Sequence, residues 1–235
     1  MIKFFKCNED YEKNIRKYTK KDGILAIVLF GIFILAYSIL AILSINFEFI
    51  KNNSLVIGCI FNIIIIVITL LFIKLNKQTL DTIGLYNGQW KKSCIIGIII
   101  ACIIFMNNCG IYLIQGSSLI DVKKIINLVV YFLLVSICEE IAFRGYISTR
   151  IYGLIKKKWI AIILVGVLFI IMHFPYRMIA YGITLKDLTI GNSGWILNLF
   201  ITHILFNFIY LKTNSIYGSI IPHWFSNLAY NIVNR

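Results

Sequence analysis

Long apolar segments dominate this sequence and constrain its fold more than any other feature. The 235-residue chain contains seven of them, joined by short connectors. An α-helix rises about 1.5 Å per residue, so about 20 residues cross the roughly 30 Å hydrocarbon core of a bilayer. The sequence therefore predicts an all-α, polytopic bundle of transmembrane helices. The seven expected spans are 23–45, 55–75, 93–115, 125–147, 159–174, 195–211 and 216–233.

The composition indicates the same class of protein. Hydrophobic residues make up 60% of the chain and charged residues only 14%, whereas soluble domains are about half apolar and about a quarter charged. These proportions exclude a water-soluble enzyme, and the wealth of Ile, Leu, Phe and Tyr excludes a disordered chain. The last three apolar segments are short, so six or eight spans are alternatives to seven. We expect one transmembrane domain over residues 23–233.

The basic residues indicate how the chain is oriented. The formal net charge is +13. With the N-terminus inside, the inner segments carry 16 Lys and Arg and the outer ones 6, while Arg144 falls within a span. Lys and Arg favour the cytoplasmic side, where they contact anionic headgroups. We therefore expect a multi-pass protein of the cell membrane, with residues 1–22 as a cytoplasmic tail that has no apolar helical face of useful length.

Two other partner classes are not expected. No basic region is interleaved with base-stacking aromatic residues, so nucleic acid is excluded as a partner. The six cysteines show no Cys-x-x-Cys spacing, and all but Cys7 fall within apolar segments. They are interpreted as small buried hydrophobic residues, not as disulfides or zinc ligands.

Ionisable side chains are rare within the apolar segments. An ionised group in a spanning helix costs about 2.5–3.5 kcal/mol on insertion scales, so such residues are functional candidates. Among the acidic residues only Glu139 and Glu140 lie deep in a span, and all three histidines lie within spans, on three different segments. This distribution predicts a polar site between the last four helices.

Helical geometry separates the two glutamates. Glu140 and Arg144 are four residues apart and share a face, whereas Glu139 is rotated by about 100°. One interpretation is that both carboxylates only satisfy Arg144 and hold the helices together. The other is that Glu139, with no cation beside it, acts as a general base.

The histidines leave a choice open. His173 ends an apolar run, and His223 lies four residues before Asn227 on one helical face. His203 and Asn207 repeat that spacing, so the residues alone do not show which pair belongs to the site. The simplest interpretation of His203 is a hydrogen bond between helices.

Three motifs now point to a known family. They occur in order on separate apolar segments: Glu139-Glu140-x-x-x-Arg144, Phe169-x-x-x-His173 and His223-x-x-x-Asn227. Together they resemble the CAAX protease and bacteriocin-processing family of intramembrane proteases, which includes the type II CAAX prenyl endopeptidases. The similar region covers about residues 120–233, the expected catalytic core.

The resemblance implies peptide-bond hydrolysis in or beside the membrane. In such a site Glu139 and His173 would activate a water, His223 and Asn227 would stabilise the oxyanion, and Glu140 and Arg144 would orient these groups. It also favours His223 over His203, because the third motif of the family follows a short turn after the penultimate helix. The implied substrate is a small membrane-associated peptide or precursor, in a bacterium, where relatives act in bacteriocin maturation, immunity or pheromone processing.

Family members have been described both as metalloproteases and as metal-free enzymes. A zinc ion is possible here, held by Glu139, His173 and His223 with one open position. Because the chain lacks a His-Glu-x-x-His helix, we expect no metal cofactor.

Two alternative functions remain at this point. A non-catalytic immunity or scaffold protein of the same fold would act through protein contacts and would not need the polar set. A transporter or proton relay also uses intramembrane Glu and His, but commonly shows repeated halves, and the sequence has no internal repeat.

Overall fold

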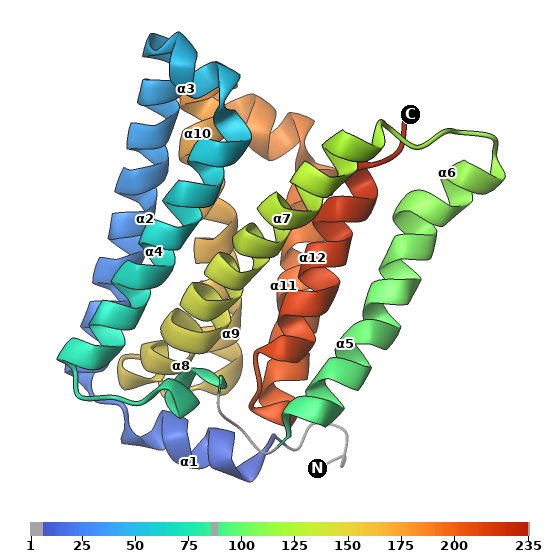
Figure 1. Cartoon of the computed structure of the whole chain (residues 1–235). Coiled ribbons are helices and arrows are strands. Elements are labelled where there is room, and N and C mark those ends of the chain that lie inside the picture. The colour runs from blue at the N-terminus through green and yellow to red at the C-terminus, as the bar shows by residue number, and fades with distance from the viewer. Residues whose placement is uncertain (1–6, 86–88, 235) are drawn as a thin grey trace. The chain divides into compact units, whose positions relative to one another are not determined.

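The structure is a computed structural model that describes residues 7–85 and 89–234 (Figure 1). These residues form helices and turns, with an isolated bridge between Leu119 and Val233. The all-α prediction is confirmed. The chain separates into two compact units. Unit 1 comprises Met1–Asn8, Leu55–Ala142 and Ile209–Arg235, and unit 2 comprises Glu9–Ser54 and Phe143–Phe208.

Six helical segments among the described residues are long and apolar enough to cross a bilayer. Their bounds are Lys20–Asn46, Ser54–Leu75, Trp90–Ile114, Val122–Gly153, Lys158–Ala180 and Ser193–Thr213. They coincide with the first six predicted spans. The seventh corresponds to helix α12 (Tyr217–Asn231), whose 15 residues rise only about 22 Å. About seven spans is compatible with this arrangement.

Unit 1 carries the two glutamates of the first motif and the whole third motif. Its helices are α4 (Ser54–Leu75), the short 3₁₀-helix η2 (Leu80–Ile83), α5 (Trp90–Phe105), the π-helix η3 (Met106–Gly110), α6 (Ile111–Ile114), α7 (Val122–Glu139) and α12. The carboxylate of Asp121 accepts hydrogen bonds from the backbone N–H groups of Lys123 and Lys124, which caps the start of α7. This cap fixes where the helix bearing Glu139 begins.

Helix α12 lies alongside α5 in unit 1 (Figure 1). Two glycines permit the approach: a Cβ on Gly97 would lie 2.9 Å from the Gly218 carbonyl oxygen, and one on Gly218 would lie 2.6 Å from the Ser93 carbonyl oxygen. The Ser93 hydroxyl accepts a hydrogen bond from the Gly218 N–H at 2.8 Å. The beginning of α12 is thereby fixed against α5, five residues before His223.

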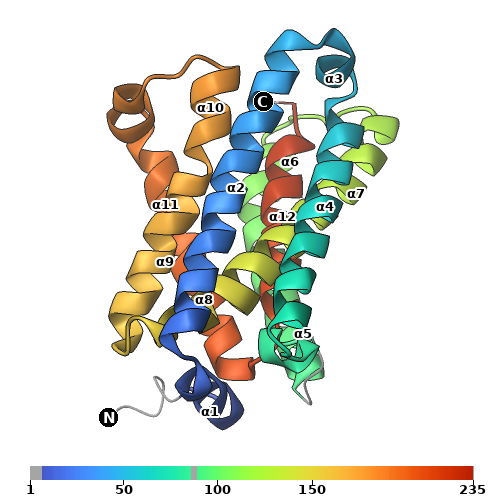
Figure 2. The same ribbon diagram turned by 90° about the vertical axis from the view of Figure 1, so that its left-hand side faces the viewer.

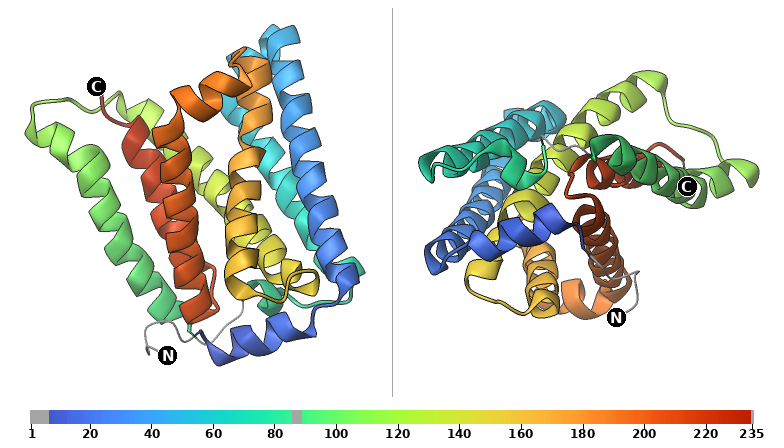
Figure 3. Two further views of the ribbon diagram at one scale, coloured as in Figure 1. Left: turned by 180° about the vertical axis from the view of Figure 1, so that it is seen from behind. Right: turned by 90° about the horizontal axis from the view of Figure 1, so that it is seen from below.

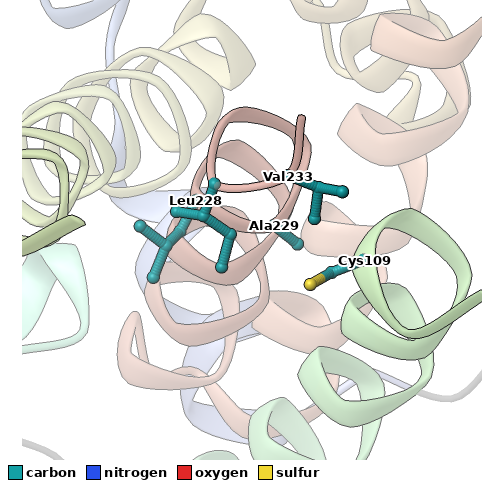
Figure 4. Packing of buried hydrophobic residues seen from close by; sticks show 5 residues of the cluster. Cys109, Leu228, Ala229 and Val233 are labelled. Carbon is teal, nitrogen blue, oxygen red and sulfur yellow. The ribbon is translucent and has the colours of Figure 1, made fainter. Parts of the chain in front are cut away.

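The far end of α12 packs through apolar side chains. Cys109 of η3 packs with Leu228, Ala229, Ile232 and Val233 (Figure 4). In addition, the indole N–H of Trp224 donates to the Val129 carbonyl of α7 at 3.0 Å. Helix α12 is therefore held by α5, η3 and α7 along its length.

Unit 2 carries the second motif (Figure 2). Its elements are α1 (Glu9–Lys17), α2 (Lys20–Asn46), α3 (Glu48–Asn52), α8 (Ser148–Arg150), the 3₁₀-helix η5 (Ile151–Gly153), α9 (Lys158–Met172), α10 (Phe174–Ala180), the π-helix η6 (Asp187–Gly191) and most of α11 (Ser193–Thr213). Another π-helix, η4 (Glu140–Ile147), follows α7 directly and runs from one unit into the other.

The tail expectation is wrong in one respect. Helix α1 (Figure 3, right) has an apolar face, because Tyr11 and Ile15 are only 1% and 6% exposed. Its Glu12 also accepts a bond from Lys158 Nζ at 2.7 Å. Two apolar residues four apart are too few to form a recognisable pattern within a mixed-charge segment. Residues 1–6 of the tail lie outside the described residues, and the division into a 1–22 tail and a 23–233 domain stays a prediction.

The close approach of α5 and α12 gives a stability prediction. We expect Gly218→Ala to lower the thermal unfolding midpoint of the purified protein by several degrees, because overpacking a fitted contact costs about 1–3 kcal/mol. Gly31→Ala is the matched control, since a Cβ there meets no atom within 4 Å and Ala favours a helix. A Gly218→Ala midpoint at or above that of Gly31→Ala would contradict the packing argument.

Candidate active site

The two glutamates of the first motif lie where the helix changes its winding. α7 ends at Glu139, and the π-helix η4 begins at Glu140. Both side chains are buried, at 5% and 0% exposure. π-helical turns are uncommon and frequently occur at functional sites. The two glutamates therefore lie at a change of helical winding.

His223 lies against both carboxylates in unit 1. Its Nδ1 donates to Glu140 Oε1 at 2.7 Å, and its Nε2 lies 3.7 Å from Glu139 Oε2. The side chain of His223 is itself 9% exposed. The predicted convergence of the first and third motifs is thus present for these three side chains.

The two distances have different chemical meanings. At 2.7 Å the Glu140 contact is a short, charge-assisted hydrogen bond. At 3.7 Å the Glu139 contact is too long for a direct hydrogen bond, and Glu139 Oε2 accepts none from the described residues. A water beside these two atoms could bond to both. Asn227, one turn after His223 on α12, shares its face.

In unit 2, the ring of Phe169 contacts the side chains of Arg144, His173 and His203. The Arg144 guanidinium lies 4.4 Å from the centre of its ring, and the rings of His173 and His203 lie at 4.9 and 5.8 Å. Phe143 packs edge-on against it at 5.1 Å. Arg144 is fully buried, and a desolvated cation over an aromatic face is stabilised by roughly 2 kcal/mol.

His173 is held in one tautomer by the backbone. It follows the last residue of α9, and its Nδ1 lies 2.8 Å from the Phe169 carbonyl oxygen. A carbonyl only accepts, so Nδ1 must carry the proton. In the neutral ring the lone pair therefore lies on Nε2, as a general base requires.

His203 takes part in a structural network instead. Its Nε2 lies 3.3 Å from the Ile162 carbonyl of α9 and 2.7 Å from Asn207 Nδ2, and Ser148 donates to Asn207 Oδ1 at 3.0 Å. Both His203 and Asn207 are buried. The interpretation of His203 as a hydrogen bond between helices is confirmed.

The structure thus assembles the predicted residues in two groups. Glu139, Glu140 and His223 meet in unit 1, while Arg144 and His173 share Phe169 in unit 2. The pairing of Glu140 with Arg144 and the joint action of Glu139 with His173 stay predictions. Within the part of the chain that the structure describes, no group of three His, Cys, Asp or Glu side chains has the arrangement of a metal site.

Sequence reasoning missed two features of this site. The motif spacing contains Phe169, but it does not reveal that this ring contacts Arg144 and both histidines of unit 2. It also does not reveal the π-helix, since π- and α-helical turns both leave residues four apart close to one face. For the contacts of Phe169, the available signal was its spacing from His173, one helical turn away.

The motif residues lie in a segment that matches a known protein family. Residues 121–229 match the Rce1-like family, described as type II CAAX prenyl endopeptidase Rce1-like. The family predicted from the three motifs is confirmed for this segment. Comparison with curated proteins and with solved structures gives no match.

The Rce1-like segment includes all seven motif residues, from Glu139 to Asn227. It begins at the residue that caps α7 and ends two residues after Asn227. The match supports a membrane-embedded endopeptidase with a peptide substrate.

The central position of Phe169 can be tested. We expect Phe169→Leu to lower the unfolding midpoint by several degrees, because it removes the cation–π contact of buried Arg144 and three ring contacts. Phe49→Leu is the control, since Phe49 is 71% exposed and should change the midpoint by a degree or less. Equal midpoints for the two variants would show that Phe169 has no special role.

Proposed function

We propose that this protein is an intramembrane endopeptidase that hydrolyses a peptide bond in a small membrane-associated peptide or precursor. The observation that carries the proposal is the buried cluster of Glu139, Glu140 and His223 within a segment that matches a peptidase family. A scaffold protein would need no such cluster. Burying two carboxylates in an apolar bundle is costly unless they serve a function.

In the proposed reaction Glu139 and His173 activate a water molecule. The water oxygen attacks the carbonyl carbon of the scissile bond, and its proton passes to the base. The C–N bond then breaks as the proton is delivered to the leaving amine, giving a new carboxylate and a new amine. A positioned general base typically contributes about 10²–10⁴-fold to the rate.

His223 and Asn227 are proposed to stabilise the oxyanion. The Glu140 carboxylate accepts the Nδ1–H of His223, which fixes the orientation of the ring. In the proposed reaction an Nε2–H of this ring donates away from Glu140, toward developing negative charge. Removal of one oxyanion donor costs about 10²–10³-fold in kcat, and the proposed role of Glu140 is to hold His223 in place.

We also propose the membrane setting predicted by the sequence. The bias of 16 to 6 basic residues supports a cytoplasmic N-terminus in the cell membrane, with Lys and Arg contacting anionic headgroups. Within the protease class, bacterial peptide maturation or bacteriocin immunity are the proposed contexts.

Loss of the Glu139 carboxylate tests the activity. Full-length protein in membranes should cleave a synthetic prenylated peptide of the CAAX type. We expect Glu139→Gln and His173→Ala each to lower the cleavage rate at least 100-fold. Glu48→Gln is the control, because Glu48 is exposed in the short helix α3. Unchanged cleavage in Glu139→Gln would refute the proposal, and a protective phenotype that survives this substitution would favour a non-catalytic role.

The preference for a metal-free mechanism has its own test. We expect cleavage by the membrane-embedded protein to persist after treatment with a strong chelator. If the chelator abolishes cleavage and zinc restores it, a metal site built on Glu139, His173 and His223 replaces the metal-free mechanism.

A further inference from the structure

Helix α5 and its continuation through η3 into α6 carry two rows of residues, each with a spacing of four. One row faces α12, as the approach of Gly97 to Gly218 shows. It comprises Ser93, Gly97, Ala101, Phe105 and Cys109, which are buried except for the partly covered Phe105. The other row is displaced by two residues, about 200° around the helix. This outer row comprises Ile95, Ile99, Ile103, Asn107 and Ile111, all of them exposed. It therefore points away from α12.

Asn107 is the polar member of the outer row. Its side chain is exposed, and its amide has no hydrogen-bond partner among the described residues. The apolar segment Trp90–Ile114 has 25 residues and a length of about 37 Å, so it exceeds a hydrocarbon core of roughly 30 Å by only about 4 Å at each end. Asn107 lies seven residues before the last of them, a distance of about 10 Å. Its amide therefore lies within the hydrocarbon.

An amide in hydrocarbon requires a partner from another helix. A polar group without a hydrogen bond is costly in lipid, and Asn side chains bond to one another across helix interfaces. The amide has one acceptor oxygen and two donor hydrogens. Its partner must therefore both donate and accept at the same depth in the membrane. The isoleucines of the outer row supply the surrounding apolar surface, which extends about 24 Å along the helix, over most of the core thickness.

We propose that a second copy of this chain packs on the outer row, so that the amide of Asn107 hydrogen-bonds to the same amide of the partner. Copies of one membrane protein insert with the same orientation. Two copies related by a twofold axis along the membrane normal therefore bring identical residues together at equal depth. Each amide then donates to the oxygen of the other, and the isoleucines of the two outer rows pack around the pair.

A second copy satisfies this surface better than a different membrane helix. A different helix would need its own donor and acceptor at the depth of Asn107, whereas a second copy supplies both by symmetry. No charged residue occurs between Ser93 and Ile114, so the surface has no charge that would repel a copy or select an oppositely charged partner. A membrane-embedded peptide is the competing occupant. The inference is independent of the proposed function, because the outer row contains none of the proposed site residues.

Energy transfer between labelled copies tests the self-association. Full-length chains that carry a donor or an acceptor fluorophore at the N-terminus are mixed in vesicles of neutral lipid, and the protein-to-lipid ratio is varied. We expect energy transfer that increases with this ratio. Asn107→Leu should weaken the association about 3- to 30-fold, as the loss of an interhelical polar bond does, without lowering the unfolding midpoint. Asn107→Gln should retain part of the association because it keeps the amide. Asn198→Leu is the control, since Asn198 is exposed on α11, and it should change nothing.

Cross-linking identifies the occupant of the outer row. We expect Ile111→Cys copies to form a disulfide-linked dimer on mild oxidation in the same vesicles, above the background of the unsubstituted chain with its native cysteines. Ile45→Cys is the matched control, because Ile45 is similarly exposed on α2, at 56% against 44% for Ile111, and it should remain at background.

Three results would overturn the inference. The first is no energy transfer at any protein-to-lipid ratio. The second is an association that Asn107→Leu leaves unchanged, because the interface would then lie elsewhere. The third is an Ile111→Cys chain that forms a disulfide only with a cysteine-bearing membrane peptide and never with its own copy, which would assign the outer row to that peptide.

Discussion

A buried charge in a transmembrane bundle must find its partner within the protein, because hydrocarbon supplies none. Three arrangements in this structure meet that requirement. The Glu140 carboxylate accepts a hydrogen bond from His223, Arg144 lies over Phe169, and Arg150 lies 4.6 Å from the ring centres of both Tyr18 and Tyr146. Each arrangement ties together segments distant in sequence, so the same residues that carry the polar chemistry also determine how the helices pack.

The packing of small residues complements these polar contacts. Because Gly97 and Gly218 lack side chains, α12 approaches α5 closely, and Ser93 bonds to its first turn. Pro222 then cannot donate to the Gly218 carbonyl, so the turn before His223 is held by tertiary contacts rather than by a complete helical ladder. The position of the His223 ring against Glu140 depends on this support.

The sequence predicted the features that follow from long-range hydropathy and from motif order. Six spans, the family over residues 121–229 and the structural role of His203 were accessible in this way. Helix α1 was not, because a single pair of apolar residues leaves no periodic signal. The π-helix at Glu140 and the contacts of Phe169 were not accessible either. Both depend on backbone winding and on side chains from other helices, which spacing along one helix does not specify.

The three histidines show how one side chain acquires different chemistry from its hydrogen-bond partner. Nδ1 of His173 donates to a neutral carbonyl, which fixes the tautomer and leaves Nε2 able to accept a proton. Nδ1 of His223 donates instead to the carboxylate of Glu140, a charged acceptor. His203 uses its Nε2 within a buried network. In the proposed mechanism His173 is a base, His223 an oxyanion donor and His203 a structural residue. The hydrogen-bond partner of each ring distinguishes these roles, and the histidine motif alone does not.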